Sequence, residues 1–374
     1  MIKRTLQEVL HQKMHTGKAI ILIGARQTGK TTLLRELLSG QDYLFLDGDD
    51  PAVRTMLAGA NTQQILRILG NNQLVFLDEA QRIPGIGLTL KIITDQFPQV
   101  QLFVSGSSSF DLSVEMNEAL TGRKWEYPLF PVTWDEFERH VGYLRAVQEL
   151  ETRLLYGSYP EILNFPGQER ERLQQLATSY LYRDVLAYGG IRKPEVLDKL
   201  LQALALQIGS EVNYNELAQI TGLNKETVSN YIDILEKGYI VFRLPSFSRN
   251  IRNEIKQNRK IYFYDTGVRN MIIGNFQPLD LRSDKGALWE NFLISERRKI
   301  HSYRGTMARS YFWRTRQQQE IDYVEEMNGK ITAWEFKWQP KEVKISVSFL
   351  NAYNAAGYVV HRDNFRDFLD PQRL

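Results

Sequence analysis

A glycine-containing loop near the start of the chain limits its fold more than any other feature of the sequence. The loop reads Gly24-Ala25-Arg26-Gln27-Thr28-Gly29-Lys30-Thr31, and it lies between an apolar run and a helical pattern that continues from Thr32. Backbone N–H groups of such a loop, together with the N-terminus of the following helix, can surround phosphate oxygens. The succession of strand, phosphate-binding loop and helix predicts a parallel α/β domain.

Individual residues of this loop have distinct roles in the prediction. The Lys30 ammonium contributes positive charge beside the β- and γ-phosphates, and the Thr31 hydroxyl reaches Mg²⁺. A glycine turn that happens to precede a lysine is the alternative, but the flanking strand and helix argue against it. We therefore expect ATP and Mg²⁺ as ligands, bound by Gly24, Ala25, Arg26, Gln27, Thr28, Gly29, Lys30, Thr31 and Thr32.

Two carboxylates follow the apolar run 74–77, at the predicted carboxyl end of a strand. Asp78 can hold Mg²⁺ there, and Glu79 can orient or deprotonate the attacking water. A solvated strand end is the alternative. Ser105 follows the apolar run 102–104, so its hydroxyl can lie beside the γ-phosphate, although a helix cap is an equally ordinary role for it. Further along, Arg123 is a candidate for stabilising transition-state charge, in cis or from a neighbouring subunit of a homo-oligomer, and its alternative is an ordinary surface arginine.

Short apolar runs separated by helical patterns divide the first part of the chain. Unbroken runs of this kind indicate a parallel sheet that helices cover on both faces. A length of 374 residues allows two or three domains, and 43% hydrophobic residues exclude a disordered or fibrous chain. The expected strands lie within residues 19–23, 43–46, 74–77 and 102–104.

We predict four domains in this α/β protein. A phosphate-loop core spans 1–133, a helical lid 134–190, a winged helix-turn-helix 191–283 and a second α/β domain 284–374. Within the third, Asn213 and Glu216 have capping-box spacing, Gly222 makes a turn, and Asn224 caps a second helix. The region 239–263 is the expected wing.

Charge and composition exclude several classes of protein. A net charge of +3 is too small to predict nucleic acid or an anionic membrane as partner of the whole molecule. Without cysteine the chain has no disulfide, catalytic thiol or cysteine-bound zinc. No apolar run approaches the roughly 20 residues of a membrane span, and residues 1–4 do not lead into an apolar signal core. We expect a soluble, cytoplasmic protein that does not contact membranes.

Local basic charge is denser in the predicted wing. The basic residues there are interleaved with Phe247 and Asn250 and accompanied by one acid, Glu254, so a wing hairpin could contact DNA phosphates. The second helix carries two exposed acids, however, and winged helices also pack against neighbouring domains. Double-stranded DNA is therefore one of two possible partners of this region, whose cations are Arg243, Arg249, Arg252, Lys256, Arg259 and Lys260.

Taken together, these motifs resemble those of a prokaryotic family of predicted AAA+ superfamily ATPases with a C-terminal domain of unknown function. The resemblance covers essentially the whole chain. It is carried by residues 3–4, 24–32, 77–81, 105–107, 122–123, 130–131, Trp134, 136–137, 159–161, 183–184, 264–267 and 289–292.

The resemblance implies an AAA+ module, a winged helix and a C-terminal fold similar to PD-(D/E)xK restriction endonucleases. It implies no cellular role. One departure concerns the second arginine sensor of many AAA+ lids, because no residue of this chain can be assigned to it.

The C-terminal likeness can be compared with the geometry of a hairpin. Asn328-Gly329 is the strongest two-residue turn signal, and it lies between two strand patterns. With these residues as the turn, paired positions sum to 657, so Asp322 faces Glu335 and Glu320 faces Lys337. These four side chains then share one face, and the other face carries Ile321, Tyr323, Thr332, Trp334 and Phe336.

This arrangement matches the resemblance residue by residue. Asp322 and Glu335 would hold Mg²⁺, and Lys337 would activate water or stabilise the phosphate in the transition state. Glu290, on the preceding apolar helix, matches an additional acid of that fold. A solvated hairpin with an ordinary ion pair between Glu320 and Lys337 is the alternative.

Three functions are consistent with these observations. The first is an ATPase that uses Asp78 and Glu79, and whose nucleotide state moves the lid against the C-terminal region. The second is an ATP-regulated, Mg²⁺-dependent nuclease that uses Asp322, Glu335 and Lys337. The third is a nucleotide-gated DNA-binding or scaffold protein that does not hydrolyse ATP.

Overall fold

The structure is a computed structural model of the chain, and it describes residues 1–106, 118–177, 194–248, 259–315 and 317–370. The chain divides into two compact units. The first unit comprises Met1–Val132 with Lys237–Tyr239, and the second comprises Thr133–Glu236 with Ile240–Leu374. The finer domain boundaries at 133/134, 190/191 and 283/284 remain a prediction, and the second of them lies outside the described residues.

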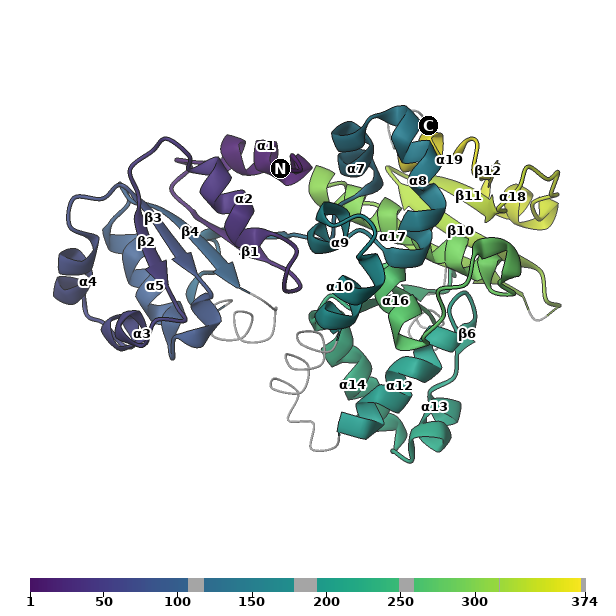
Figure 1. The fold of residues 1–374 in the computed structure, drawn as a ribbon, viewed down its shortest axis with the longest axis horizontal. Helices are drawn as coiled ribbons and strands as arrows, with labels where there is room; N and C mark the ends of the chain where they lie inside the picture. Colours follow the sequence, from purple (N-terminus) through teal and green to yellow (C-terminus); the bar gives the residue numbers. More distant parts are fainter. Residues whose placement is uncertain (107–117, 178–193, 249–258, 316, 371–374) are drawn as a thin grey trace. The chain divides into compact units, whose positions relative to one another are not determined.

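The first unit contains a five-stranded sheet whose strands are all parallel, in the order β2-β3-β4-β1-β5. All four apolar runs that were predicted as strands belong to this sheet. The strands are β1 (Ala19–Ile23), β2 (Leu44–Asp47), β3 (Leu74–Asp78), β4 (Gln101–Gly106) and β5 (Lys124–Pro128). The helices are α1 (Thr5–Lys13), α2 (Lys30–Leu37), α3 (Pro51–Leu57), α4 (Thr62–Leu69) and α5 (Ile86–Gln96), with the short 3₁₀ turn η1 (Ala80–Arg82). Figure 1 shows this unit in purple and blue.

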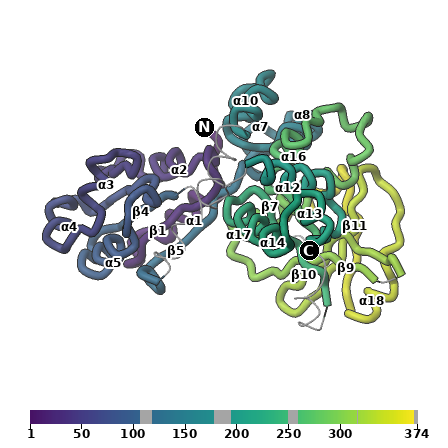
Figure 2. Tube along the Cα trace, turned by 90° about the horizontal axis from the view of Figure 1, so that it is seen from below, coloured from purple at the N-terminus to yellow at the C-terminus, as the bar shows by residue number. Residues whose placement is uncertain are grey.

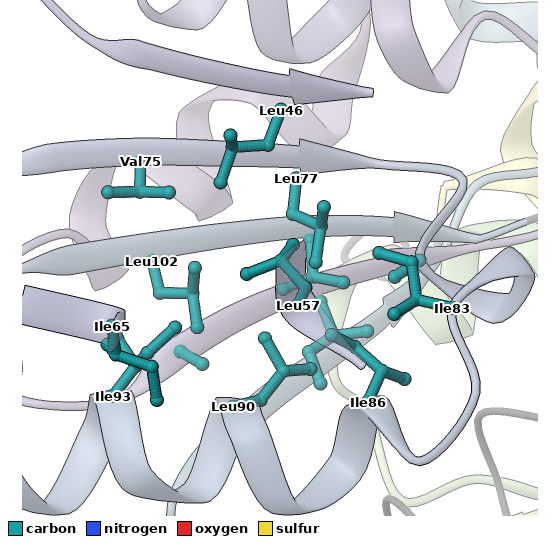
Figure 3. Close-up of a cluster of buried hydrophobic side chains, with 14 of the residues drawn as sticks. Leu46, Leu57, Ile65, Val75, Leu77, Ile83, Ile86, Leu90, Ile93 and Leu102 are labelled. Atoms are coloured by element: carbon teal, nitrogen blue, oxygen red, sulfur yellow. The ribbon is translucent and has the colours of Figure 1, made fainter. Parts of the chain in front are cut away.

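The core of the first unit lies between one face of the sheet and helices α3, α4 and α5. Figure 3 shows Ile86, Leu90 and Ile93 projecting from one side of α5 toward strand residues such as Val75 and Leu102. Their spacing follows the helical period, and all five side chains are buried. Burial of this face fixes the sheet, and therefore fixes the positions of the strand ends that carry the polar candidates.

Strand β4 lies between β1 and β3, although it follows both in the chain. Because the strands are parallel, their carboxyl ends meet at one edge of the sheet. The phosphate loop follows β1, Asp78 ends β3, and Ser105 lies near the end of β4. This strand order brings the three features side by side.

Helices predominate in the first part of the second unit. They are α7 (Trp134–Val141), α8 (Tyr143–Tyr156), α9 (Pro160–Asn164), α10 (Glu169–Leu176), α12 (Pro194–Leu206), α13 (Tyr214–Thr221), α14 (Lys225–Lys237) and α16 (Thr266–Ile272). The predicted cap of α14 is present, because the Asn224 side chain accepts a hydrogen bond from the Thr227 N–H at 2.7 Å. Asn213 caps α13 by accepting from the Asn215 N–H at 2.9 Å, and not through the predicted spacing to Glu216.

A three-stranded antiparallel sheet accompanies α13 and α14. Its order is β6-β8-β7, with β6 (Glu211–Val212), β7 (Val241–Pro245) and β8 (Arg259–Phe263). The pairing of β7 with β8 agrees with the hairpin expected in region 239–263. Its assignment as a winged helix remains a prediction.

The C-terminal part of the second unit combines a long helix with a four-stranded sheet. The order is β12-β11-β10-β9, and only β11 and β12 are parallel. The elements are α17 (Lys285–Arg304), β9 (Arg309–Arg314), β10 (Glu320–Met327), β11 (Lys330–Phe336), α18 (Val347–Tyr353), β12 (Ala356–Val360) and α19 (Phe365–Leu369), with a 3₁₀ turn η3 (Leu279–Leu281) ahead of α17. Figure 2 traces this part in green to yellow.

The hairpin register is confirmed from Met327 paired with Lys330 to Tyr323 paired with Trp334. From Tyr323 toward Ile321, the side chains of β10 no longer alternate between the two faces as predicted. One additional residue in β10, between Ile321 and Val324, interrupts the pairing with β9, and Ile321 joins the apolar cluster of Val324 and Ala333. The prediction that Ile321 shares a face with Tyr323 was therefore wrong, because a β-bulge shifts the alternation of side chains by one residue.

Among the described helices, none has the length and apolar character needed to cross a membrane.

Candidate functional site

The phosphate loop is held in a conformation that only certain residues tolerate. Gly24 has φ of 145°, and a Cβ there would lie 2.3 Å from the carbonyl oxygen of Leu129. Gly29 has φ of 93° and immediately precedes α2. The Lys30 ammonium donates to the carbonyl oxygens of Gly24 and Ala25, at 2.9 Å each. The loop thus places a buried cation among its own backbone dipoles, where phosphate oxygens could replace the carbonyls.

Arg4 connects this loop to the end of β5. Its guanidinium is 6% exposed and donates to the carbonyl oxygens of Thr28 at 2.8 Å and Phe130 at 2.6 Å. Arg4 precedes α1, whereas Phe130 follows β5. A fixed, planar donor group therefore bridges the loop and the neighbouring strand end.

Asp78 lies at the carboxyl end of β3 and is 7% exposed. The Ser105 hydroxyl donates to its carboxylate, and the Glu79 N–H donates to the same oxygen at 3.1 Å and to the Ser105 oxygen at 3.3 Å. Two hydrogen bonds thus orient Asp78 at the edge where the loop lies, and the third joins their two donors, Glu79 and Ser105. Ser105 therefore contacts Asp78, and residues 107–117, which a helix cap at Ser105 would involve, lie outside the described residues.

Glu79 has left-handed backbone geometry, with φ of 48°, which is uncommon for a residue with a side chain. Its carboxylate accepts a hydrogen bond from the side-chain amide of Gln81. The segment after β2 packs closely against Glu79, because a Cβ at Gly48 would lie 2.4 Å from the Glu79 carbonyl oxygen. Strain of this kind is maintained by the surrounding structure and is frequent at reactive sites.

Arg123 lies away from this edge. Lys124, the next residue, pairs with Ala19 at the amino end of β1, whereas the phosphate loop follows the carboxyl end of that strand. The five residues of β1 separate the two edges by roughly 15 Å. Arg123 instead forms an ion pair with Asp95, in which both side chains are more than one third exposed. The structure therefore does not bring Arg123 to the phosphate loop of its own chain.

The second unit brings together the candidates of the C-terminal hairpin. The Asp322 carboxylate accepts from the Phe336 N–H at 2.8 Å. The Lys337 ammonium lies 3.1 Å from Glu335 and 3.6 Å from Asp322. Burial raises the pKa of Glu335 to about 7, and the neighbouring charge of Asp322 adds to this effect while Lys337 opposes it.

Glu290, on α17, belongs to the same group of charges. Its carboxylate accepts from the Tyr262 hydroxyl and lies 3.1 Å from the Lys260 ammonium. Burial raises the pKa of Glu290 to about 7 against the opposing effect of Lys260, and the charge of Asp322 raises it further. Glu320 lies 2.7 Å from Lys260 and 3.8 Å from Arg314. The alternative, an ion pair between Glu320 and Lys337, is therefore wrong, because each of the two has a nearer charge of the opposite sign.

Two carboxylates, Asp322 and Glu335, are compatible with Mg²⁺, which commonly binds one or two carboxylates and completes its coordination with water. The chemistry of this donor set therefore fits the ion that the resemblance implies. Among the residues that the structure describes, no group of three or more histidine, aspartate or glutamate side chains is arranged to hold a metal ion.

The structure agrees only in part with the prediction that these cations contact DNA. Arg243 is paired with Glu236 and, at 2.6 Å, with Asp233, and Lys260 is 1% exposed. These two residues cannot form part of an exposed basic surface, which corrects the prediction for them. Arg249, Arg252 and Lys256 lie outside the described residues.

The sequence motifs include Arg4 and Gln81 but predict no role for either residue, and they predict Lys260 only as an exposed cation. The signal for Gln81 was its position two residues after Glu79. The contacts of Arg4 and Lys260 join segments far apart in the chain, so no local pattern predicts them.

Three family models match successive parts of the chain. Residues 16–138 match a family model described as an AAA domain. Residues 147–279 and 285–372 match two models that are each described as a domain of unknown function. The match to an AAA domain thus covers most of the first unit, including the phosphate loop.

Relatives occur in bacteria and archaea. An uncharacterized protein of Mycobacterium tuberculosis is 29% identical over 334 residues, which cover 88% of this chain and 72% of that protein. An uncharacterized protein of Methanocaldococcus jannaschii is 23% identical over 337 residues, covering 83% and 73% respectively. Among solved structures, a Walker-type ATPase of Pyrococcus abyssi has 14% identity and a TM-score of 0.47, covering 73% of this chain and 96% of that one.

Proposed function

We propose that the first unit binds ATP with Mg²⁺ and hydrolyses it through Asp78 and Glu79. The observation that carries this proposal is the convergence of Lys30, Asp78 and Ser105 at the ends of three adjacent parallel strands. An ammonium within the loop and an oriented carboxylate beside it suit a nucleotide phosphate chain. Thr31 and Asp78 would hold Mg²⁺, which neutralises charge on the β- and γ-phosphates.

In this proposal different groups of the chain have different roles. Backbone N–H groups of residues 24–32 bind the phosphates, and Lys30 leaves its carbonyl partners to contact phosphate oxygens. Glu79 orients or deprotonates the attacking water. Ser105, which contacts Asp78, acts as a sensor of the γ-phosphate at the end of β4.

Nucleotide binding by the full-length chain tests the first step. We expect Lys30→Ala to abolish ATP binding, because it removes the cation within the loop. Lys91→Ala, in α5, is the matched control and should bind ATP as the wild type does. Unchanged ATP affinity and turnover in Lys30→Ala would refute the proposal.

A second candidate function is Mg²⁺-dependent cleavage of DNA at Asp322, Glu335 and Lys337. The observation that favours it is the contact of Lys337 with both carboxylates. Asp322 and Glu335 would hold Mg²⁺, which makes bound water acidic and neutralises phosphate charge. The Lys337 ammonium would then be released to contact a phosphate oxygen.

Incubation of supercoiled plasmid with the full-length chain tests this candidate. Nicking that requires Mg²⁺ or Mn²⁺ and disappears in Asp322→Asn would support it. A salt-dependent shift of duplex DNA without cleavage would instead favour the non-enzymatic DNA-binding function.

A further inference from the structure

A buried lysine of the three-stranded sheet lies at the centre of the C-terminal carboxylates. Lys260 is on β8, the middle strand of that sheet, and is 1% exposed. Its ammonium lies 3.1 Å from Glu290 on α17 and 2.7 Å from Glu320 on β10. One cation thus joins three elements that are far apart in the sequence.

The environment of Lys260 keeps its ammonium charged. Burial lowers the pKa of Lys260, but the charges of Glu290 and Glu320 outweigh burial and raise it above its ordinary value. The aromatic ring of Phe312 lies beneath the ammonium, with its centroid 5.4 Å away. A buried charge without such partners would be strongly destabilising.

The two lysines of this cluster differ in their access to solvent. Lys337 is the cation of Asp322 and Glu335, and its side chain is 35% exposed. Lys260 is the cation of Glu290 and Glu320, and it is enclosed. The Lys337 ammonium can move into water when a metal ion approaches its carboxylates. The Lys260 ammonium is enclosed and cannot reach water in this way.

We propose that Lys260 is a built-in cation of the C-terminal site, which occupies the place of a second metal ion between Glu290 and Glu320. The inference rests on the second proposed function for one point, the assignment of Asp322 and Glu335 as metal ligands. Its consequence is that the cluster binds one divalent ion at most, at Asp322 and Glu335. Lys260 is accordingly a positioning residue, because it acts through Glu290 and Glu320.

Mn²⁺ binding and thermal unfolding of the full-length chain, without nucleotide, test this proposal. The variants are Lys260→Met, which removes the charge and keeps the aliphatic stem, and Lys260→Met combined with Glu290→Gln. Arg259→Met, the adjacent position on β8, is the matched control. Asp322→Asn identifies the Mn²⁺ that binds at Asp322 and Glu335, as distinct from ions bound elsewhere.

We expect Lys260→Met to lower the melting temperature by about 10 °C, because it leaves the buried Glu290 carboxylate without its cation. Saturating Mn²⁺ should restore this loss, and the variant should bind one ion more per chain than the wild type. Adding Glu290→Gln should restore stability without metal and remove the additional ion. The wild type and Arg259→Met should bind equal numbers of ions.

Several results would overturn the proposal. It fails if Lys260→Met melts within about 2 °C of Arg259→Met, if Mn²⁺ stabilises Lys260→Met no more than the wild type, or if the double variant is as unstable as Lys260→Met. If Lys260→Met does not fold, a folded double variant still supports the pairing, and an unfolded one refutes it.

Failure of the second proposed function can be distinguished from failure of this inference. A wild-type chain that never cleaves DNA, combined with the expected behaviour of Lys260→Met, would remove the nuclease and keep the built-in cation. Cleavage that depends on Asp322, combined with a Lys260→Met variant that melts and binds Mn²⁺ as the wild type does, would keep the nuclease and remove the built-in cation.

Discussion

The side-chain amide of Asn291 pairs with both backbone groups of Phe263. Its oxygen accepts from the Phe263 N–H at 2.8 Å, and its nitrogen donates to the Phe263 carbonyl at 2.9 Å. Helix α17 is thereby attached to strand β8 by a contact that imitates strand pairing. Because Glu290 is the preceding residue, this attachment also holds its carboxylate beside Lys260 and Tyr262.

We expect Asn291→Ala to lower the free energy of unfolding by about 2 kcal/mol, because it leaves two buried backbone groups without this partner. Chemical denaturation monitored by tryptophan fluorescence measures the change. Asn351→Ala, at an exposed position of α18, is the control and should change stability little. Equal stability of the two variants would contradict the role given to Asn291.

Glu79→Gln should reduce ATP turnover by about 100-fold or more while it leaves ATP affinity within a few fold of the wild type. The substitution keeps the shape of the side chain and removes its ability to accept a proton. Steady-state hydrolysis and equilibrium nucleotide binding measure the two quantities separately. A variant that turns over ATP at the wild-type rate would remove Glu79 from the mechanism.

Arg4→Met should weaken ATP binding by about 10-fold, because the Thr28 and Phe130 carbonyls lose a shared donor and the phosphate loop loses its connection to β5. Arg4→Lys should recover only part of this loss, since an ammonium lacks the planar fork that reaches both oxygens. Lys3→Met alters an exposed neighbour that pairs with Glu8, and it should bind ATP normally. An Arg4→Met chain with wild-type affinity would show that the loop holds its shape unaided.

Arg123→Ala should leave ATP affinity unchanged, because Arg123 lies at the opposite edge of the sheet from the phosphate loop of its own chain. If a neighbouring subunit supplies it, turnover per chain should rise with protein concentration in the wild type and not in the variant. Asp95→Asn is the control, because it breaks the surface ion pair but keeps the arginine. Turnover that is unchanged in Arg123→Ala would identify an ordinary surface arginine.

The stability of the C-terminal site should depend on pH through Glu335. Its pKa in the folded chain is about 7, above the ordinary 4.5. The protonated carboxyl therefore contributes stability that is fully present below pH 4.5 and is lost as pH rises through about 7. Mg²⁺ should raise the melting temperature more at about pH 8 than at about pH 6, because the carboxylates are then charged.

Asp322→Asn removes a charge that raises this pKa, so it should flatten the pH dependence and remove the response to Mg²⁺. Thermal unfolding at several pH values measures both effects. Asp363→Asn, whose side chain is 60% exposed, should behave as the wild type does. A wild-type pH profile in Asp322→Asn would contradict the assigned coupling.

Several features of the protein followed from the sequence alone, because their determinants are local. The glycines at 24 and 29 allow the backbone angles of the phosphate loop, and the apolar runs before Asp78 and Ser105 produce buried parallel strands. The turn at Asn328-Gly329 sets the pairing of its own hairpin, since a two-residue loop of this type admits one register. In each case a few neighbouring residues contain all the information that the feature requires.

Tertiary structure decided which of these features meet. The insertion of β4 between β1 and β3 brings Ser105 to Asp78, and the same parallel arrangement carries Arg123 to the far edge. A bulge in β10 changes the face of Ile321, and β8 carries Lys260 to Glu290 and Glu320. Periodicity and turn chemistry describe the neighbours of a residue along the chain. The order of strands, and therefore the partners of Arg4 and Lys260 through space, depends on how whole elements bury their apolar faces together.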